Sequence, residues 1–153
     1  MKMIRLILLI FLFVKISYSE DYKSIEITAE TMEWNKQKGQ AIAKGNAKAV
    51  QGNTIIKANT IIAILNETSE NQKITKLLAN GNVEFSRDNQ FATGDSAVYN
   101  LDKKEVIIKG SVNLKRQDNI IKGNKLIIDF ETGLSKMIGS NPKEKVKMKY
   151  STN

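Results

Sequence analysis

The sequence predicts an all-β domain of many short, consecutive antiparallel strands that form two bent sheets. Three observations lead to this prediction. Glycines recur at a fixed spacing, apolar residues alternate with polar ones over most of the chain, and no segment has helical periodicity. The length of 153 residues suits a single domain.

Residues 1–19 have the pattern of a secretory signal peptide. A positively charged start and nine apolar residues at 6–14 precede Ser17 and Ser19, which fit the small-residue rule for cleavage before Glu20. A retained membrane anchor is the alternative, but a spanning helix needs about 20 apolar residues. We therefore expect cleavage, which leaves a mature chain with a formal charge of +5.

The glycines mark an internal repeat. Three marker glycines each precede Asn or Ser, and 13 residues later stands a second small residue. The next marker follows 16 residues further on, so the period is 29, apart from a seven-residue insertion near residues 66–72. Such self-similarity is typical of repeated supersecondary units that share a core. The first set is Gly45, Gly81 and Gly110, and the second is Ala58, Gly94 and Gly123.

Strands and turns follow from the same spacing. Apolar residues stand at even offsets from each marker glycine, which places them on one face of a strand. Offsets +11 and +17, for example Ile56 and Ile62, are apolar exceptions among the odd positions. Turn-forming residues recur at 51–53, 87–89 and 117–119.

The marker glycines and the small residues after them are predicted to be corners, where a strand bends from one sheet into the other. Two sheets bent toward each other enclose an elongated apolar groove, which takes a ligand or closes as an ordinary sandwich core.

Composition excludes several kinds of chemistry. The chain has no Cys and no His, so it has no disulfide, no thiolate or His-ligated metal site and no Ser-His nucleophile. It also lacks a phosphate-binding Gly-x-x-x-x-Gly-Lys-Ser/Thr loop. We expect no enzymatic activity, no cofactor and no metal. Export makes nucleic acid an unsuitable partner despite 24 Lys and Arg against 16 Asp and Glu, and an acidic lipid or glycan fits better.

Four phrases carry a resemblance to a known family. They are residues 27–30 (ITAE), 44–47 (KGNA), 79–85 (ANGNVEF) and 109–112 (KGSV). With the repeat and the export signal, the chain resembles the OstA-like (LptA) family of periplasmic lipopolysaccharide-transport proteins over residues 24–140. The resemblance implies a β-jellyroll at 20–140 with an open hydrophobic groove. It also implies lipid A as ligand, LptC-like and LptD-like partners, and head-to-tail association with further copies in the periplasm.

The resemblance assigns candidate site residues. The large apolar side chains at the even offsets are expected to line the groove: Met32, Trp34, Ile61, Val83, Phe85, Tyr99, Leu101, Val106, Ile108, Val112, Leu114, Leu126, Ile128 and Phe130. Two arginines are candidates for lipid-phosphate contacts, Arg87 and Arg116. Four residues on the terminal strands, 25–34 and 126–138, are candidates for assembly edges, where a second copy adds a strand: Ile25, Ile27, Ile127 and Met137.

Other interpretations stay open. The same fold serves a membrane-anchored LptC-like partner or a domain of the translocon, and a closed core favours a structural β-repeat module. A glycan-cleaving site would use Glu30, Asp95 and Asp102, but their recurrence at bends favours turn hydrogen bonding. Residues 141–153 form a basic tail or a final edge strand.

Overall fold

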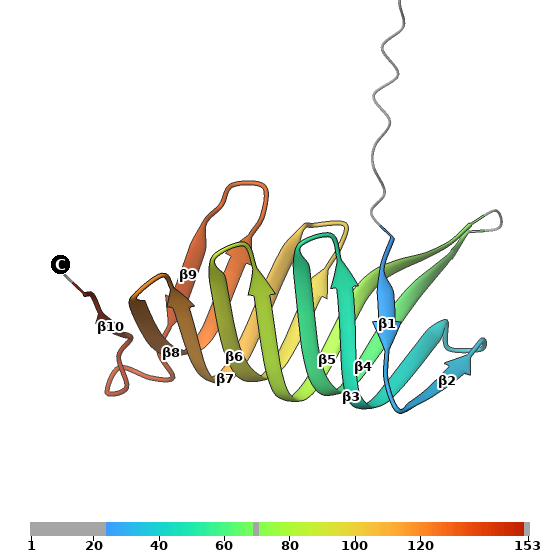
Figure 1. Cartoon of the computed structure of the whole chain (residues 1–153), viewed down its shortest axis with the longest axis horizontal. Coiled ribbons are helices and arrows are strands. Elements are labelled where there is room, and N and C mark those ends of the chain that lie inside the picture. The colour runs from blue at the N-terminus through green and yellow to red at the C-terminus, as the bar shows by residue number, and fades with distance from the viewer. Residues whose placement is uncertain (1–23, 69–70, 152–153) are drawn as a thin grey trace, which may run out of the picture.

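The computed structural model describes residues 24–68 and 71–151, and the predicted signal peptide lies outside them. The described chain forms ten β-strands and no helix (Figure 1). The predicted all-β jellyroll class is confirmed. The strands are β1 (Glu26–Thr28), β2 (Thr31–Asn35), β3 (Gln40–Gln51), β4 (Thr54–Thr68), β5 (Asn71–Arg87), β6 (Gln90–Asn100), β7 (Glu105–Arg116), β8 (Asn119–Asp129), β9 (Ser135–Ile138) and β10 (Lys147–Lys149).

All ten strands belong to one antiparallel sheet. The long strands β3 to β8, of 11 to 17 residues, pair in chain order. At one end β1 and β2 both pair with β3, and at the other end β9 and β10 both pair with β8. Each long strand bends, so the sheet folds into two arms that face each other along the length of the molecule (Figure 1).

We call these the first arm and the second arm. The first arm comprises β2, residues 40–44, 60–68, 71–80, 96–100, 105–109 and 125–129, and β9. The second arm comprises β1, residues 47–51, 54–57, 83–87, 90–94, 112–116 and 119–123, and β10. Each repeat unit therefore contributes two neighbouring stretches of strand to each arm.

The arms meet at β-bulges, and these fall at the predicted corners. The register shifts after Lys44, Lys57, Asn80, Thr93 and Lys109. The three marker glycines have φ between +78° and +85°, and the Asn or Ser after each has φ between +44° and +49°. Two successive residues with positive φ bend the strand, and the bulge interrupts the pairing only locally, so the two strands pair again on both sides of it. Each marker glycine thus lies within one continuous strand that bends there, as the sequence predicts.

Each marker glycine is required by a close neighbour as well as by its φ. A Cβ at Gly45 would lie less than 3.0 Å from the Glu30 side chain, which accepts a 2.6 Å hydrogen bond from Asn46 Nδ2. The same arrangement recurs at the next two corners, where Asn59 lies over Gly81 and Asp95 lies over Gly110. Glu30 and Asp95 therefore serve the corners, as the turn interpretation expects.

Cross-strand partners share a face, so the register defines rows of side chains that run from one end of the molecule to the other. Three inner rows are almost entirely apolar. The first arm carries Met32, Ala43, Ile61, Ala79, Ala97, Ile108, Leu126 and Met137, and also Trp34, Ala41, Ala63, Leu77, Tyr99, Val106, Ile128 and Ser135. The second arm carries Ile27, Ala49, Ile56, Phe85, Ala92, Leu114, Ile121 and Met148.

The inner rows form the hydrophobic core. Their central members are buried, with Ile61, Val106, Ile108 and Leu126 at 0% exposure, and residues of both arms belong to one cluster. Burying such a side chain stabilises the fold by roughly 1.5–3 kcal/mol. The end members of the rows lack a neighbour on one side, so the apolar surface continues to both ends of the sheet.

Candidate functional site

A cavity of about 990 Å³ lies between the two arms, at the strand ends farthest from the corners. Gln51, Thr54 and Arg87 line it from the second arm, and Tyr99, Leu101 and Phe130 line it from the first arm. Its volume is at the upper end of the roughly 300–1,000 Å³ range of small-molecule sites. Apolar side chains at its base and charged ones at its mouth suit an amphipathic ligand.

Five residues join the arms across this open side, and we call them the clasp: Gln51, Phe85, Arg87, Tyr99 and Phe130. The Phe130 ring stacks on Phe85 with centroids 6.1 Å apart and meets Tyr99 edge-on at 5.7 Å. The Arg87 guanidinium carbon lies 4.1 Å from the centre of the same ring, a cation–π distance. Tyr99 Oη donates a 2.7 Å hydrogen bond to Gln51 Oε1. The clasp holds the arms together beside the cavity.

The environment of Tyr99 keeps its hydroxyl protonated. Burial raises the pKa of this phenol, and the positive charge of Arg87 opposes that rise only in part. Tyr99 is therefore a neutral hydrogen-bond donor to Gln51 at any pH near neutrality. Arg87 itself donates a 3.2 Å hydrogen bond to buried Thr54 and has Asp88 3.8 Å from its Nε atom, so its guanidinium is held in place over Phe130.

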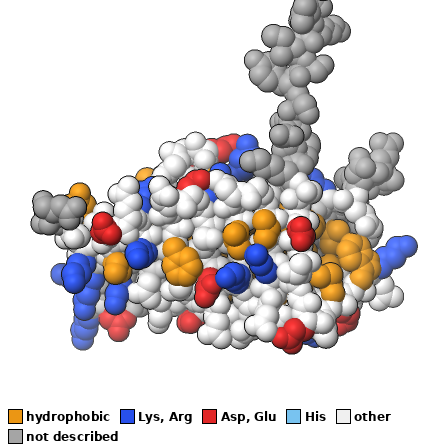
Figure 2. All heavy atoms as spheres, viewed as in Figure 1, with side chains coloured by type: hydrophobic (Ala, Val, Ile, Leu, Met, Phe, Trp, Pro, Cys, Tyr) orange, Lys and Arg blue, Asp and Glu red, His pale blue; other side chains and the backbone are white. Residues whose placement is uncertain are grey.

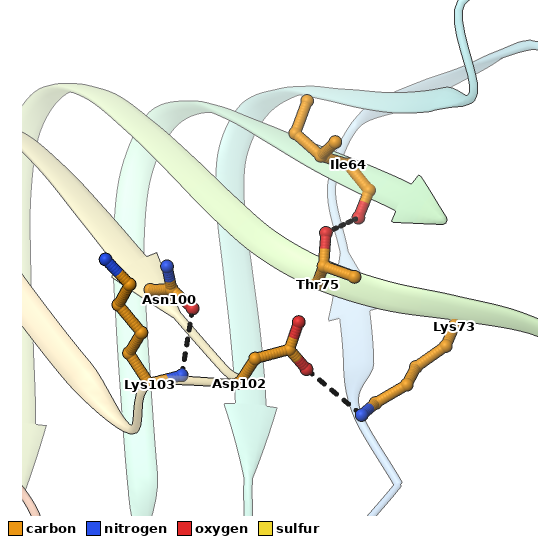
Figure 3. Close-up of polar contacts among 6 residues, drawn as sticks. All are labelled: Ile64, Lys73, Thr75, Asn100, Asp102 and Lys103. Carbon is orange, nitrogen blue, oxygen red and sulfur yellow. Dashed lines mark hydrogen bonds and ion pairs between the residues drawn. The ribbon is translucent and has the colours of Figure 1, made fainter. Parts of the chain in front are cut away.

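At the rim of the first arm, beside the cavity, strand β5 is linked to the turn that follows β6 (Figure 3). Lys73 and Asp102 form an ion pair at 3.0 Å, and the Asn100 side chain accepts a hydrogen bond from the Lys103 backbone N–H at 3.0 Å. Along the same rim, the Leu101 backbone N–H donates to Thr75 at 3.0 Å. Exposed pairs of this kind contribute little to stability. Their effect is to place alternating charges at the mouth of the cavity.

The same links recur in the next repeat. The Phe130 backbone N–H donates a 2.9 Å hydrogen bond to the carbonyl of Lys104, and the Lys104 ammonium lies 3.4 Å from Glu131. In the first full repeat the Leu65 N–H donates to the Gly39 carbonyl at 2.9 Å. The large apolar residue at the end of each unit is thus fixed by a backbone carbonyl that precedes it by 26 residues: the carbonyls of Gly39 and Lys104 lie in turns, and that of Thr75 lies in β5.

The predicted lining residues lie on the inner face, but their exposure differs. Ten of them are buried: Ile61, Val83, Phe85, Tyr99, Val106, Ile108, Val112, Leu114, Leu126 and Ile128. Leu101 and Phe130 are half-buried at the cavity. Met32 and Trp34 are 56% and 55% exposed, because they stand on β2, beyond which no strand lies in the described chain.

The other predicted residues are dispersed. Arg87 lies at the cavity, whereas Arg116 is exposed, and the register puts Gln90 between them. Ile25 and Ile27 are half-buried at the β1 end, and Met137 lies on the outermost strand β9.

Ile127 does not lie at an edge, because β9 pairs with the part of β8 that carries it. The prediction took residues 126–138 as one terminal strand, but they span β8, a turn and β9. Gln51 and Thr54 were missed as partners of the clasp. Gln51 stands six residues after its marker glycine, as Arg87 and Arg116 do, and this shared offset is the sequence signal that could have indicated it.

The described residues contain no cluster of candidate metal ligands and no helix that could span a membrane. No three acidic side chains in 24–68 and 71–151 gather closely enough to hold a metal. The same residues include no helix of the length and hydropathy needed to cross a bilayer.

An open, bent antiparallel sheet with apolar inner rows defines a β-jellyroll of the kind used in lipopolysaccharide transport. Residues 26–134 match the family described as "LptA/(LptD N-terminal domain) LPS transport protein". The chain belongs to this family of lipopolysaccharide transport proteins, which confirms the resemblance seen in the sequence.

Two relatives and one solved structure are similar to this chain. An uncharacterised protein of Rhizobium meliloti is 30% identical over 115 residues, 71% of this chain, and the match spans 62% of that relative's length. An uncharacterised protein of Rickettsia prowazekii is 29% identical over 128 residues, 80% of this chain and 88% of the relative. The crystal structure of LptH from Pseudomonas aeruginosa, described as the LptA-homologous periplasmic component of the lipopolysaccharide transport device, has a TM-score of 0.74 at 15% identity. It covers 85% of this chain and 96% of its own, which establishes the shared fold.

Proposed function

We propose that this protein is a periplasmic, non-enzymatic bridge that shields the acyl chains of lipopolysaccharide between the inner and outer membranes. One observation carries the proposal: inner rows that are apolar except at Ser135 run through all eight strands of each arm, and they reach exposed Met32 and Trp34 on β2 and exposed Met148 on β10. A lipid that moves along such rows meets similar apolar contacts at every position, so no single step traps it.

The cavity is the entry point in this proposal. Acyl chains enter between the arms beside the clasp, and the charged rim meets the anionic sugar phosphates. The deeper inner residues pack against each other in the free protein, so the arms separate as chains enter. The ten buried lining residues then exchange contacts with each other for contacts with lipid, which keeps the apolar area exposed to water small.

Partners follow from the same rows. Their uncovered ends suit LptC-like and LptD-like proteins of the same fold and further copies of this chain, each of which prolongs the apolar surface. Arg87 and Arg116 are proposed contacts for lipid phosphate, with Arg87 the better placed because it lines the cavity. The lipid-lining role of the inner residues, including Met32 and Trp34, is part of the proposal.

Site-specific photocrosslinking tests it. A benzoylphenylalanine in place of Phe85 lies on the inner face, and the same group in place of Phe91 lies on the outer face. We expect crosslinks to lipopolysaccharide in living cells from position 85 and none above background from position 91. Equal crosslinking at both positions, or none at position 85 in a folded protein, would contradict the proposed function.

A further inference from the structure

The two ends of the sheet carry opposite charges. Residues 24–35, which include β1 and β2, contain three Glu and no Lys or Arg. Residues 134–151, which include β9 and β10, contain five Lys and one Glu. The turn that follows β2 adds Lys36 and Lys38 at the first end, so the excess of carboxylates there lies on the two strands themselves. Figure 2 shows Lys and Arg side chains gathered at the end that carries β10, and hydrophobic side chains with a basic side chain beside them at the end that carries β1 and β2.

The register places these charges in matching rows on the outer face. One row of the first arm starts at Glu33, passes through apolar residues such as Ile62 and Val98, and ends at Lys136. One row of the second arm starts at Glu26 and ends at Lys149. On both arms, therefore, the same row has a carboxylate at its first strand and an ammonium at its last.

The terminal strands also have free edges of the correct direction. Within the described chain β1 and β2 pair only with β3, and β9 and β10 pair only with β8. Each arm has eight strands that alternate in direction, so a second copy translated along the molecule presents its β2 antiparallel to β9 and its β1 antiparallel to β10. Exposed edges of this kind accept a further strand.

We infer that opposite charges at the two ends set the polarity and the register of assembly between copies of this chain. Lys136 and Lys149 of one copy lie beside Glu33 and Glu26 of the next, because only the in-register, head-to-tail arrangement continues each row. The inner rows continue at the same time, with Met137 beside Met32 of the next copy.

The other arrangements are opposed by charge. Joining two β10 ends brings five Lys against five Lys, and joining two β1 ends brings Glu against Glu; like charges directly opposite destabilise a sheet. A one-residue slip exchanges the inner and outer faces of the added strand, so it also removes the apolar contacts. Glu33 is weakly compensated in the free chain: within residues 24–68 and 71–151 its one ion pair is with Lys44 at 4.0 Å, and both side chains are more than half exposed. This inference rests on the head-to-tail association in the proposed function and adds the residues that direct it.

Charge reversal tests the inference by analytical ultracentrifugation of the purified mature protein. The head variant carries Glu26→Lys and Glu33→Lys, and the tail variant carries Lys136→Glu and Lys149→Glu. We expect the wild type to associate with rising concentration and each variant alone to associate roughly tenfold or more weakly, since two attractive pairs become repulsive. An equimolar mixture of the two variants recovers association to within about threefold of the wild type, because each head then meets an opposite tail.

A control matched to the tail variant carries Lys76→Glu and Lys109→Glu, which make the same change in net charge as that variant but on β5 and β7, away from the free edges. It should associate like the wild type. Unchanged association of the head and tail variants, or a mixture that recovers nothing, would overturn the inference.

The wild type and all variants are also tested for lipopolysaccharide binding, which the outer-face charges should leave unchanged. A wild type that does not bind lipopolysaccharide contradicts the proposed function. If the wild type binds it but the charge reversals leave association unchanged, only the inference about the terminal charges is contradicted. If the wild type stays monomeric at every concentration, a second copy does not pair with these edges, and the inference is overturned in favour of another protein of the same fold.

Discussion

Replacing Phe130 with Ala removes the centre of the clasp. This ring is half-buried and makes three contacts: the stack on Phe85 at 6.1 Å, the edge contact with Tyr99 at 5.7 Å and the cation–π contact with Arg87 at 4.1 Å. Each aromatic pair contributes about 0.5–1.5 kcal/mol beyond burial, and a cation–π contact about 0.5–1 kcal/mol. A fully buried Phe→Ala change destabilises by about 3–5 kcal/mol.

For a half-buried ring with these contacts we expect the free energy of unfolding to fall by about 2–3 kcal/mol. At roughly 3–5 °C per kcal/mol for a domain of this size, Tm falls by about 6–15 °C. The assay is thermal unfolding followed by circular dichroism. Phe130→Leu, which keeps apolar volume but removes the ring, should lie between the variant and the wild type.

Phe91→Ala is the matched control. Phe91 is 41% exposed on the outer face of the second arm and takes no part in the clasp. Its replacement should lower stability by about 1 kcal/mol or less. If Phe130→Ala lowers Tm no more than Phe91→Ala does, the contacts across the arms do not hold them together and the clasp is wrong. Lipid binding by Phe130→Ala should also weaken, since Phe130 lines the cavity at which acyl chains enter in the proposed function.

Three further outcomes follow from individual contacts. Tyr99→Phe removes the hydrogen bond to Gln51 and should lower stability by about 1 kcal/mol in chemical denaturation, with the same m-value as the wild type; no change would show that the bond is absent in solution. Gly81→Ala places a Cβ against Asn59 at φ +78°, so Tm should fall, and pairing it with Asn59→Gly should recover only part of the loss because the φ strain stays. The Asp129 carboxylate accepts backbone hydrogen bonds from the turn that follows it, and these bonds lower its pKa. The stability that Asp129 gives the folded protein is therefore present above the pKa of the unfolded state and is lost as pH falls through the lower pKa of the folded state. An NMR titration midpoint at or above the ordinary Asp value would contradict this.

The corners were predictable from the sequence, because their cause is local. Gly45 and its counterparts stand where φ is positive and where a neighbouring side chain leaves no room for a Cβ, and both constraints select glycine at fixed spacing. The spacing of the repeat therefore predicts where the strands bend. It also reported the inner face, since alternation along a strand depends only on the pleat.

The apolar exceptions needed the structure for their explanation. Each turn and each bulge resets which parity faces inward, so Ile56, at an odd offset, is buried on the second arm beside Phe85. Ile62 stands four residues after the corner at Ala58. It also has an odd offset, but it lies on the outer face of the first arm. An even or odd offset therefore assigns a residue to the correct face only where the number of turns and bulges between it and the marker glycine is known.

The clasp was not predictable, because its contacts join residues of different arms at no fixed separation. Phe130 reaches Arg87 and Phe85 only because both arms bend at the corners by the amount that brings their ends together. Similarly, the exposure of Trp34 and the interior position of Ile127 depend on where β2 and β9 pair, which periodicity alone does not specify.

The most direct measurement of the central claim is mass spectrometry of lipid that co-purifies with the protein from the periplasm of a Gram-negative host. The account predicts lipopolysaccharide bound to the wild type and retained through gel filtration, with its acyl chains protected from added deacylating enzyme. A folded protein that carries no lipid, and that takes up none when lipopolysaccharide is supplied, would contradict it.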